Sequence, residues 1–157
     1  MIGIPIGLLY TNATEWVVHK VVLHGWGKKK GSFWNFHWGE HHRESRKNGH
    51  IDEAYLKPLW ESWNPQSKEA TALGVGLVTH LPLAPVAPFF YGTLVYSAFR
   101  YYKLHRRSHL DTDWAKENLP WHYDHHMGKD QDSNWCVTHP FFDIVMGTRK
   151  PYLGTEA

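Results

Sequence analysis

Residues 70–99, ATALGVGLVTHLPLAPVAPFFYGTLVYSAF, decide the fold of this 157-residue chain. The stretch contains no Asp, Glu, Lys or Arg, and His80 is its only ionisable residue besides the tyrosines. Pro82, Pro85 and Pro88 interrupt its middle, because proline lacks an amide hydrogen and clashes with the preceding helical turn. We therefore expect two apolar helical legs joined by a turn over residues 82–88.

The legs of this hairpin are short. Each has about a dozen residues, or roughly 18 Å at the helical rise, whereas a helix needs about 20 apolar residues to cross a bilayer. Basic residues flank the stretch on both sides, which is typical of flanks on the cytosolic face: Lys28–Lys30 before it, and Arg100, Lys103, Arg106 and Arg107 after it. We expect a membrane protein, integral or monotopic, whose hairpin enters and returns on the cytosolic side. The alternative is a hairpin inside the core of a soluble cytoplasmic protein.

Histidine is concentrated on both sides of the hairpin. Ten of the thirteen histidines form four clusters, two before it and two after it: His19-Lys-Val-Val-Leu-His24, His37-Trp-Gly-Glu-His41-His42, His105-Arg-Arg-Ser-His109 and His122-Tyr-Asp-His125-His126. A neutral imidazole offers one lone pair to a metal and one N–H to a neighbour. Ten imidazoles exceed the need of one tetrahedral ion. The sequence therefore predicts a dinuclear, all-histidine centre at the open end of the hairpin.

Helical spacing indicates which of these side chains can share an ion. At about 100° per residue, His105 and His109 lie about 40° apart on one helix face. His37 and His41 have the same spacing and should also share a face. His41 and His42 are about 100° apart, which is wide enough to address two different ions.

The other two clusters are spaced differently. His122, His125 and His126 lie within about 60° of one another and can point into one cavity. His19 and His24 are about 140° apart on an ideal α-helix. That pair requires either a distortion at Gly25 or two separate ions flanking the helix end.

Three further helices complete the expected compact, all-α bundle. They cover residues 14–23, capped by Thr14, residues 32–42, and residues 51–63, whose apolar side also carries Asp52. The length fits one domain over residues 1–157.

Composition narrows the classes of function. A net charge of +2 gives no reason to expect a nucleic-acid partner. Cys136 is the only cysteine, which excludes thiolate-rich zinc sites. A zinc hydrolase keeps about three protein ligands, so it would leave most of the clustered histidines unused. Imidazole suits zinc, copper, iron and nickel alike, so the ligand type does not name the metal.

The order HxxxxH, HxxxHH, HxxxH and HxxHH, with an apolar hairpin in the middle, resembles the fatty acid hydroxylase superfamily. These proteins are membrane-type, histidine-rich, non-haem di-iron oxygenases and include sterol desaturases and carotenoid hydroxylases. The tail Asn134-Trp-Cys-Val-Thr-His-Pro-Phe-Phe-Asp143-Ile-Val-Met-Gly147-Thr148 is similar to the closing segment of the family. The resemblance runs from about Glu15 to Thr148. The second cluster departs from it, with three residues rather than two before its doublet.

The resemblance implies an oxygen-dependent hydroxylase that acts on an unactivated C–H bond of a fatty acyl, sterol or carotenoid substrate. It implies two iron ions, dioxygen as co-substrate, and an electron donor of the ferredoxin or cytochrome b5 type. The implied metal ligands are His19, His24, His37, His41, His42, His105, His109, His122, His125 and His126. The alternatives are a lipid desaturase of the same superfamily and a non-catalytic, histidine-rich metal-binding protein at a membrane.

Ligating imidazoles usually donate their second N–H to a carboxylate or a carbonyl. Asp143 is the first candidate for such a partner, followed by Asn134, Asp124, Glu40, Asp111 and Asp113.

The other three histidines have different expectations. His50 and His139 are expected at the periphery of the centre. His80 either makes a local hydrogen bond in the core or lines a substrate channel. The aromatic side chains of the hairpin, such as Phe89 and Phe99, suit an acyl, isoprenoid or sterol-like chain as substrate.

Overall fold

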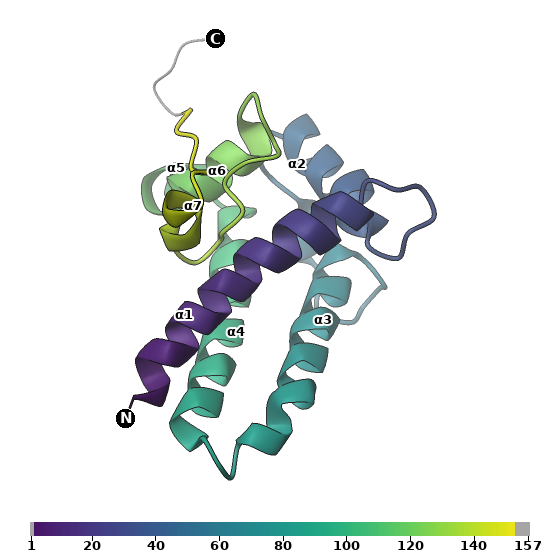
Figure 1. Ribbon diagram of the computed structural model, residues 1–157. Coiled ribbons are helices and arrows are strands. Elements are labelled where there is room, and N and C mark those ends of the chain that lie inside the picture. Colours follow the sequence, from purple (N-terminus) through teal and green to yellow (C-terminus); the bar gives the residue numbers. More distant parts are fainter. Residues whose placement is uncertain (1, 153–157) are drawn as a thin grey trace.

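The computed structural model describes residues 2–152, which form helices and turns without any β-strand. The expected all-α class is confirmed. Three long helices, α1 (Gly3–Val17), α3 (Pro65–His80) and α4 (Pro88–Ser108), form the stem of the molecule (Figure 1). Four short helices lie toward the other end: α2 (Arg43–Lys47), α5 (Thr112–Asn118), α6 (Pro120–Met127) and α7 (Phe141–Val145).

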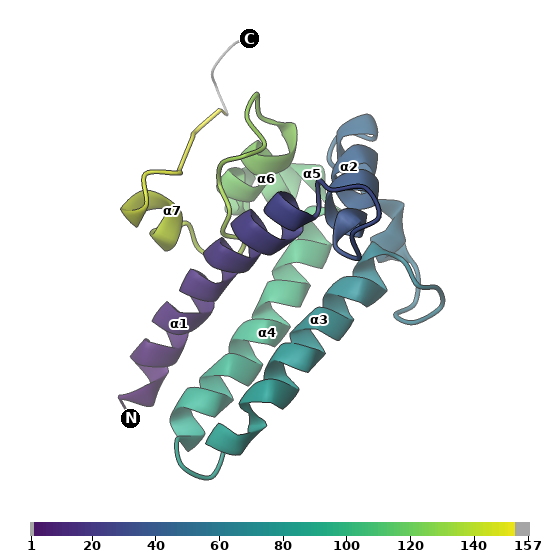
Figure 2. The same cartoon turned by 45° about the vertical axis from the view of Figure 1, so that its right-hand side comes forward.

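Helices α3 and α4 lie side by side in both views and are joined by residues 81–87 (Figures 1 and 2). This connection contains the short 3-10 helix η4 (Leu81–Leu83). Helix α3 begins where the Asn64 side chain accepts a hydrogen bond from the Ser67 amide, with Pro65 in its first turn. Helix α4 begins at Pro88.

Helix α1 packs closely against α4 because two glycines leave room for it. A Cβ atom on Gly7 would lie 2.8 Å from Cβ of Thr93, and one on Gly3 would lie 2.7 Å from the Phe90 amide nitrogen. Both distances are too short for a real side chain, so any larger residue would push the helices apart.

The first helix starts eleven residues earlier than the sequence predicted, at Gly3, and it does not end in α-helical form. Thr14 is inside it, where its hydroxyl donates to the Tyr10 carbonyl rather than capping the helix. After Val17 the chain continues as a π-helix, η1 (Val18–Trp26). A second π-helix, η2 (Phe36–His42), leads directly into α2.

The helix expected over residues 51–63 is absent, so that prediction was wrong. Only the 3-10 helix η3 (Glu53–Leu56) forms there, with the Asp52 carboxylate accepting from the Ala54 amide at its start. Pro58 follows soon after, and Trp60 has a positive φ of 73°, which a helix cannot contain.

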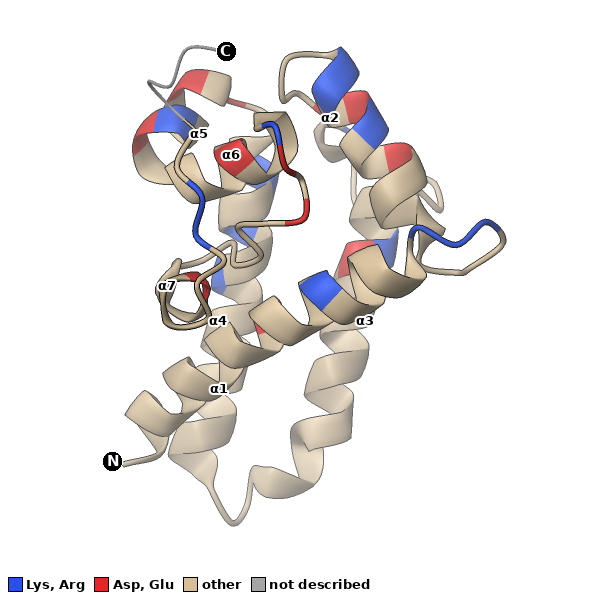
Figure 3. Cartoon of the chain, turned by 45° about the horizontal axis from the view of Figure 1, so that its top comes forward, with Lys and Arg blue, Asp and Glu red and all other residues tan. Residues whose placement is uncertain are grey.

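Charged residues are distributed unevenly along the molecule. Lys, Arg, Asp and Glu lie at the end with the short helices, whereas the far ends of α1, α3 and α4 carry none (Figure 3). Apolar side chains are exposed at that uncharged end, among them Val78 and Val86 at 68% and 76% exposure. Within residues 2–152, no helix combines the length and the apolar character that crossing a membrane requires.

Candidate metal centre

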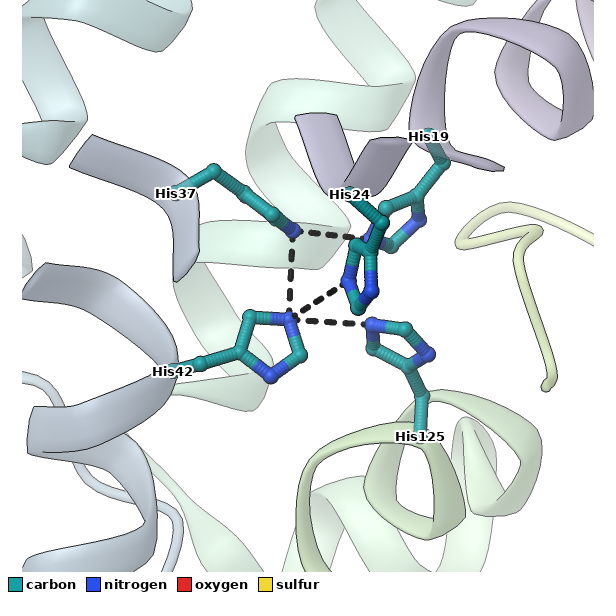
Figure 4. A group of neighbouring side chains, drawn as sticks. All are labelled: His19, His24, His37, His42 and His125. Carbon is teal, nitrogen blue, oxygen red and sulfur yellow. Dashed lines mark hydrogen bonds between the residues drawn. The ribbon is translucent and has the colours of Figure 1, made fainter. Parts of the chain in front are cut away.

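Five buried imidazoles converge in what we call the first histidine group: His19, His24, His37, His42 and His125. They come from η1, η2 and α6, and their rings turn toward one another (Figure 4). Each offers one nitrogen that lies within 4.8 Å of the others. The Nε2 atom of His42 is 3.1 Å from that of His24, 3.2 Å from that of His37 and 3.0 Å from that of His125. The Nε2 atoms of His19 and His37 are 2.9 Å apart.

The π-helices explain how this group forms. Their hydrogen bonds run from residue i to i+5, so residues five apart lie above one another. His19 and His24 are five apart in η1, and His37 and His42 are five apart in η2. Both pairs therefore join the same group, and the alternative of separate ions for His19 and His24 was wrong.

The second histidine group consists of His41, His105, His109 and His126, whose nitrogens also lie within 4.8 Å of one another. His105 and His109 share it, as their helical spacing predicted. The expected pairing of His37 with His41 was wrong, because η2 turns them into different groups. His122 adjoins this group, with its Nε2 atom 3.1 Å from that of His109.

In three imidazoles of the first group the outer nitrogen contacts a backbone carbonyl or a carboxylate, whereas His42 Nδ1 lies 2.9 Å from the Gln131 amide nitrogen. The Nδ1 atoms of His19 and His125 lie 2.5 Å and 2.6 Å from the carbonyl oxygens of Trp135 and Ser133. The Nδ1 atom of His24 lies 3.1 Å from an Asp132 carboxylate oxygen. These oxygens can only accept, so in His19, His24 and His125 the proton sits on Nδ1 and the Nε2 lone pair faces the other imidazoles.

Three imidazoles of the second group show the same pattern, whereas His126 Nδ1 has no partner within the described residues. His41 Nδ1 lies 2.7 Å from an Asp52 carboxylate oxygen, and His109 Nδ1 lies 2.8 Å from the His50 carbonyl oxygen. His105 Nδ1 pairs with Glu69, whose same oxygen also accepts from the Tyr55 hydroxyl at 2.7 Å. Carboxylate–histidine pairs of this kind fix the ring orientation and increase the basicity of a metal ligand.

The donor set fits two metal ions. The Nε2 atoms of the first group are as little as 2.9–3.2 Å apart, which is close enough for them to share one cation. Neighbouring ligands around one ion at about 2.0–2.1 Å are themselves separated by about 2.9–3.4 Å. In the second group, the Nε2 atoms of His41, His105 and His126 are buried without any hydrogen-bond partner in the described part of the chain. A cation would satisfy all three.

Burial keeps these imidazoles neutral. Loss of hydration, followed by repulsion among the neighbouring rings, lowers the pKa of nine histidines: His19, His24, His37, His42, His50, His109, His122, His125 and His126. The pKa of His125 falls to about 3, with the Ser133 carbonyl opposing the shift. At neutral pH these rings are unprotonated, which is the form that binds a metal.

Asp143 and Asn134 support the centre indirectly. The buried Asp143 carboxylate accepts from the amides of Trp135 and Cys136 at 2.8 Å each, and so fixes the segment whose carbonyl faces His19. Asn134 has a positive φ of 58°, and its side-chain oxygen accepts from the Lys150 amide at 2.7 Å. It lies between the two residues whose carbonyls face His19 and His125.

The other sequence candidates form ion pairs or a helix cap. Glu40 pairs with Lys68, Asp124 pairs with Arg149, and Asp113 pairs with Lys116. Asp111 caps α5 by accepting from the Trp114 amide.

Three carboxylates beside the imidazoles were missed in the sequence: Asp52, Glu69 and Asp132. Glu69 and Asp132 lie far along the chain from their histidine partners, so no local pattern identifies them. Asp52 could have been noticed, because an acidic residue on the apolar side of a predicted helix is unexpected and suggests a buried polar partner. It is buried against His41.

The remaining histidines divide as follows. His139 is exposed, as expected, whereas the peripheral position expected for His50 was wrong, because it is fully buried beside His109. His80 is only partly buried, so the expected position in the core was wrong, but it does have a local contact, with Nδ1 2.7 Å from the Gly76 carbonyl oxygen. Its Nε2 atom is 2.8 Å from the Tyr10 hydroxyl, and it lines a pocket.

That pocket has a volume of about 430 Å³ and lies among α1, η1, α3 and α4. Its walls are mostly apolar and include Leu73, Val75, Leu77 and Leu94. His19 and His37 of the first histidine group are also part of its lining. An apolar molecule in the pocket would therefore contact the candidate metal centre.

No model of a protein family matches this chain, and no curated protein or solved structure matches it either.

Proposed function

We propose that this protein is an oxygen-dependent di-iron hydroxylase of a lipid-like substrate, as its resemblance to the fatty acid hydroxylase superfamily implies. The single observation that carries the proposal is the apolar pocket walled by His19 and His37 of the first histidine group. Metal ligands in the wall of an apolar cavity suit a reaction at an unactivated C–H bond, which needs a metal and a dry site.

Two iron ions, when bound, would supply the activation of dioxygen. The ligand assignment follows the two histidine groups, with His122 completing the second. Nitrogen ligands suit an oxidising reaction better than thiolates, which are easily oxidised. The only cysteine, Cys136, is fully buried, and burial raises the pKa of its thiol. It is thereby kept in its unreactive thiol form.

The chain orients the substrate by shape. The pocket extends from Tyr10 and His80 to His19 and His37, so a chain-like apolar molecule would have one end at the centre. The polar pair of Tyr10 and His80 suits a polar group at the other end of the substrate.

Lipid would reach the pocket from the uncharged end of the stem. Residues 2–14 and 70–99 contain no Asp, Glu, Lys or Arg, and several of their apolar side chains are exposed. An uncharged surface with exposed apolar side chains favours contact with a bilayer. We propose that this end contacts a membrane, with the candidate metal centre and the charged residues facing the cytosol.

The test uses protein purified without oxygen, loaded with Fe²⁺ and supplied with a reductant, a lipid extract and ¹⁸O₂. Hydroxylation consumes one O₂, two electrons and two protons, and it yields one C–OH group and one water. We expect one ¹⁸O atom in the product and none with His125→Ala. Reductant-dependent and O₂-dependent loss of two hydrogens without ¹⁸O incorporation would instead identify the desaturase. A protein that binds metal but consumes no O₂ would be the non-catalytic alternative.

A further inference from the structure

His50 is an eleventh imidazole packed among the candidate ligands. It is fully buried, with its ring centre 4.5 Å from that of His109 and 5.4 Å from that of His126. One nitrogen each of His50, His109 and His122 lies within 4.8 Å of the other two. These three therefore form a third set of convergent donors, which shares His109 with the second histidine group.

Neither ring nitrogen of His50 has a hydrogen-bond partner within the described residues. An imidazole without partners is an expensive residue to bury, because it loses its bonds to water and gains none. The Nδ1 atom of His122 is unpartnered as well. A cation beside His50 would satisfy the lone pair on one of its ring nitrogens.

The backbone of His50 is also strained. Its φ is 86°, a value that residues other than glycine rarely adopt. The conformation is held by the His50 amide, which donates to the Ser45 carbonyl at 2.6 Å, and by the His50 carbonyl, which faces His109 Nδ1. Glycine at position 50 could make both backbone contacts without strain. These contacts therefore do not explain why the residue is histidine. Backbone strain of this kind is common at functional sites.

We propose that His50 is a metal ligand. With His109 and His122 it provides an alternative binding position for the ion of the second histidine group, which we call the second ion. This proposal rests on the function proposed above. His109 directs only Nε2 inward, because Nδ1 faces the His50 carbonyl, and a single nitrogen cannot bind two ions at once. The two positions are therefore alternatives for one ion, and the total stays at two ions per chain.

The test is a Co²⁺ titration of the metal-free protein, followed by visible absorption and by competition with a chelator. His50→Phe keeps the size of a ring but removes its lone pairs, and His50→Gly keeps the backbone conformation and removes the side chain. The exposed His139, changed to Phe, is the matched control. We expect both His50 variants to bind the second ion about 10-fold or more weakly and to change its spectrum. The first ion should keep its affinity.

The outcomes separate the two proposals. If wild-type protein binds two Co²⁺ ions and both His50 variants match it in affinity and spectrum, His50 is no ligand and only this inference is overturned. If wild-type protein binds fewer than two ions, the dinuclear centre fails and this inference fails with it. If His50→Phe unfolds the apoprotein, His50→Gly decides the question, because glycine accepts the observed φ without strain.

Discussion

Replacing Asp52 by Asn should weaken the second ion without removing any ligand. The two carboxylate oxygens of Asp52 have separate tasks, since one pairs with His41 Nδ1 at 2.7 Å and the other accepts from the Ala54 amide at 2.9 Å. A carboxamide has one oxygen in place of two, so it serves one of these donors and loses the negative charge. Loss of such a partner typically costs 10–100-fold in metal affinity, which is about 1.4–2.7 kcal/mol.

Asp132→Asn is the matched comparison. Asp132 makes the same kind of contact with His24, but its side chain is 54% exposed against 3% for Asp52. Water can replace an exposed partner, so we expect a much smaller loss, confined to the first ion. Competition with a chelator, read separately for the two ions, measures both variants. Equal losses in the two variants, or a loss of the first ion in Asp52→Asn, would refute the assignment of Asp52 to the second group.

Four further predictions follow from the described contacts. Ala72 lines the pocket, so Ala72→Trp should fill it and abolish turnover while two metal ions stay bound, which product analysis and metal analysis together would check. A Cβ atom on Gly27 would lie 1.8 Å from the Leu23 carbonyl oxygen, so Gly27→Ala should lower the free energy of unfolding by about 1–3 kcal/mol in denaturant titrations; Gly74→Ala, with open space around it, should not. Val86→Asp, at the uncharged end, should reduce cosedimentation with phosphatidylcholine vesicles, whereas Glu44→Gln at the charged end should not. The metal-free protein should lose stability as pH falls below 6.5, the pKa of histidine in the unfolded chain. The pKa values of His50 and His125 in the folded protein are about 3, so the unfolded chain binds more protons in this range. Each such histidine lowers the free energy of unfolding by about 1.4 kcal/mol per pH unit. Glu15 acts in the opposite direction, since burial raises its pKa to about 7, but it is one group against nine histidines. Unfolding midpoints that stay constant from pH 7 to 5 would contradict the reasoning.

The helical class and the convergence of the four histidine clusters could be predicted from the sequence, because composition and spacing act locally. The uncharged run with its three prolines indicated two helices with a break between them, and the structure has α3 and α4 on either side of residues 81–87. Each of the ten expected histidines lies in one of the three convergent sets.

The π-helices could not be predicted, and they decide which histidines share a group. The α-helical angles separated His19 from His24 and paired His37 with His41. Tertiary packing selects the i to i+5 hydrogen bonds instead, and every sequence-based angle in η1 and η2 is changed by them.

Partners that are far apart in the sequence could not be predicted either, because tertiary packing brings them together. Glu69 meets His105 only because α3 lies beside α4. His50 lies beside His109 and His122 with a left-handed backbone, which no periodicity in residues 48–52 indicates. The sequence thus indicated the ten clustered histidines, together with Asp143 and Asn134, but not His50 or the three carboxylates beside the imidazoles.

The most direct test of the dinuclear centre is metal analysis of the chain after anaerobic loading with Fe²⁺ and removal of unbound metal. The two histidine groups predict two iron ions per chain in the wild type and a clear loss of bound iron in His125→Ala. Zero or one ion in the wild type, or an unchanged two ions in His125→Ala, would contradict the account.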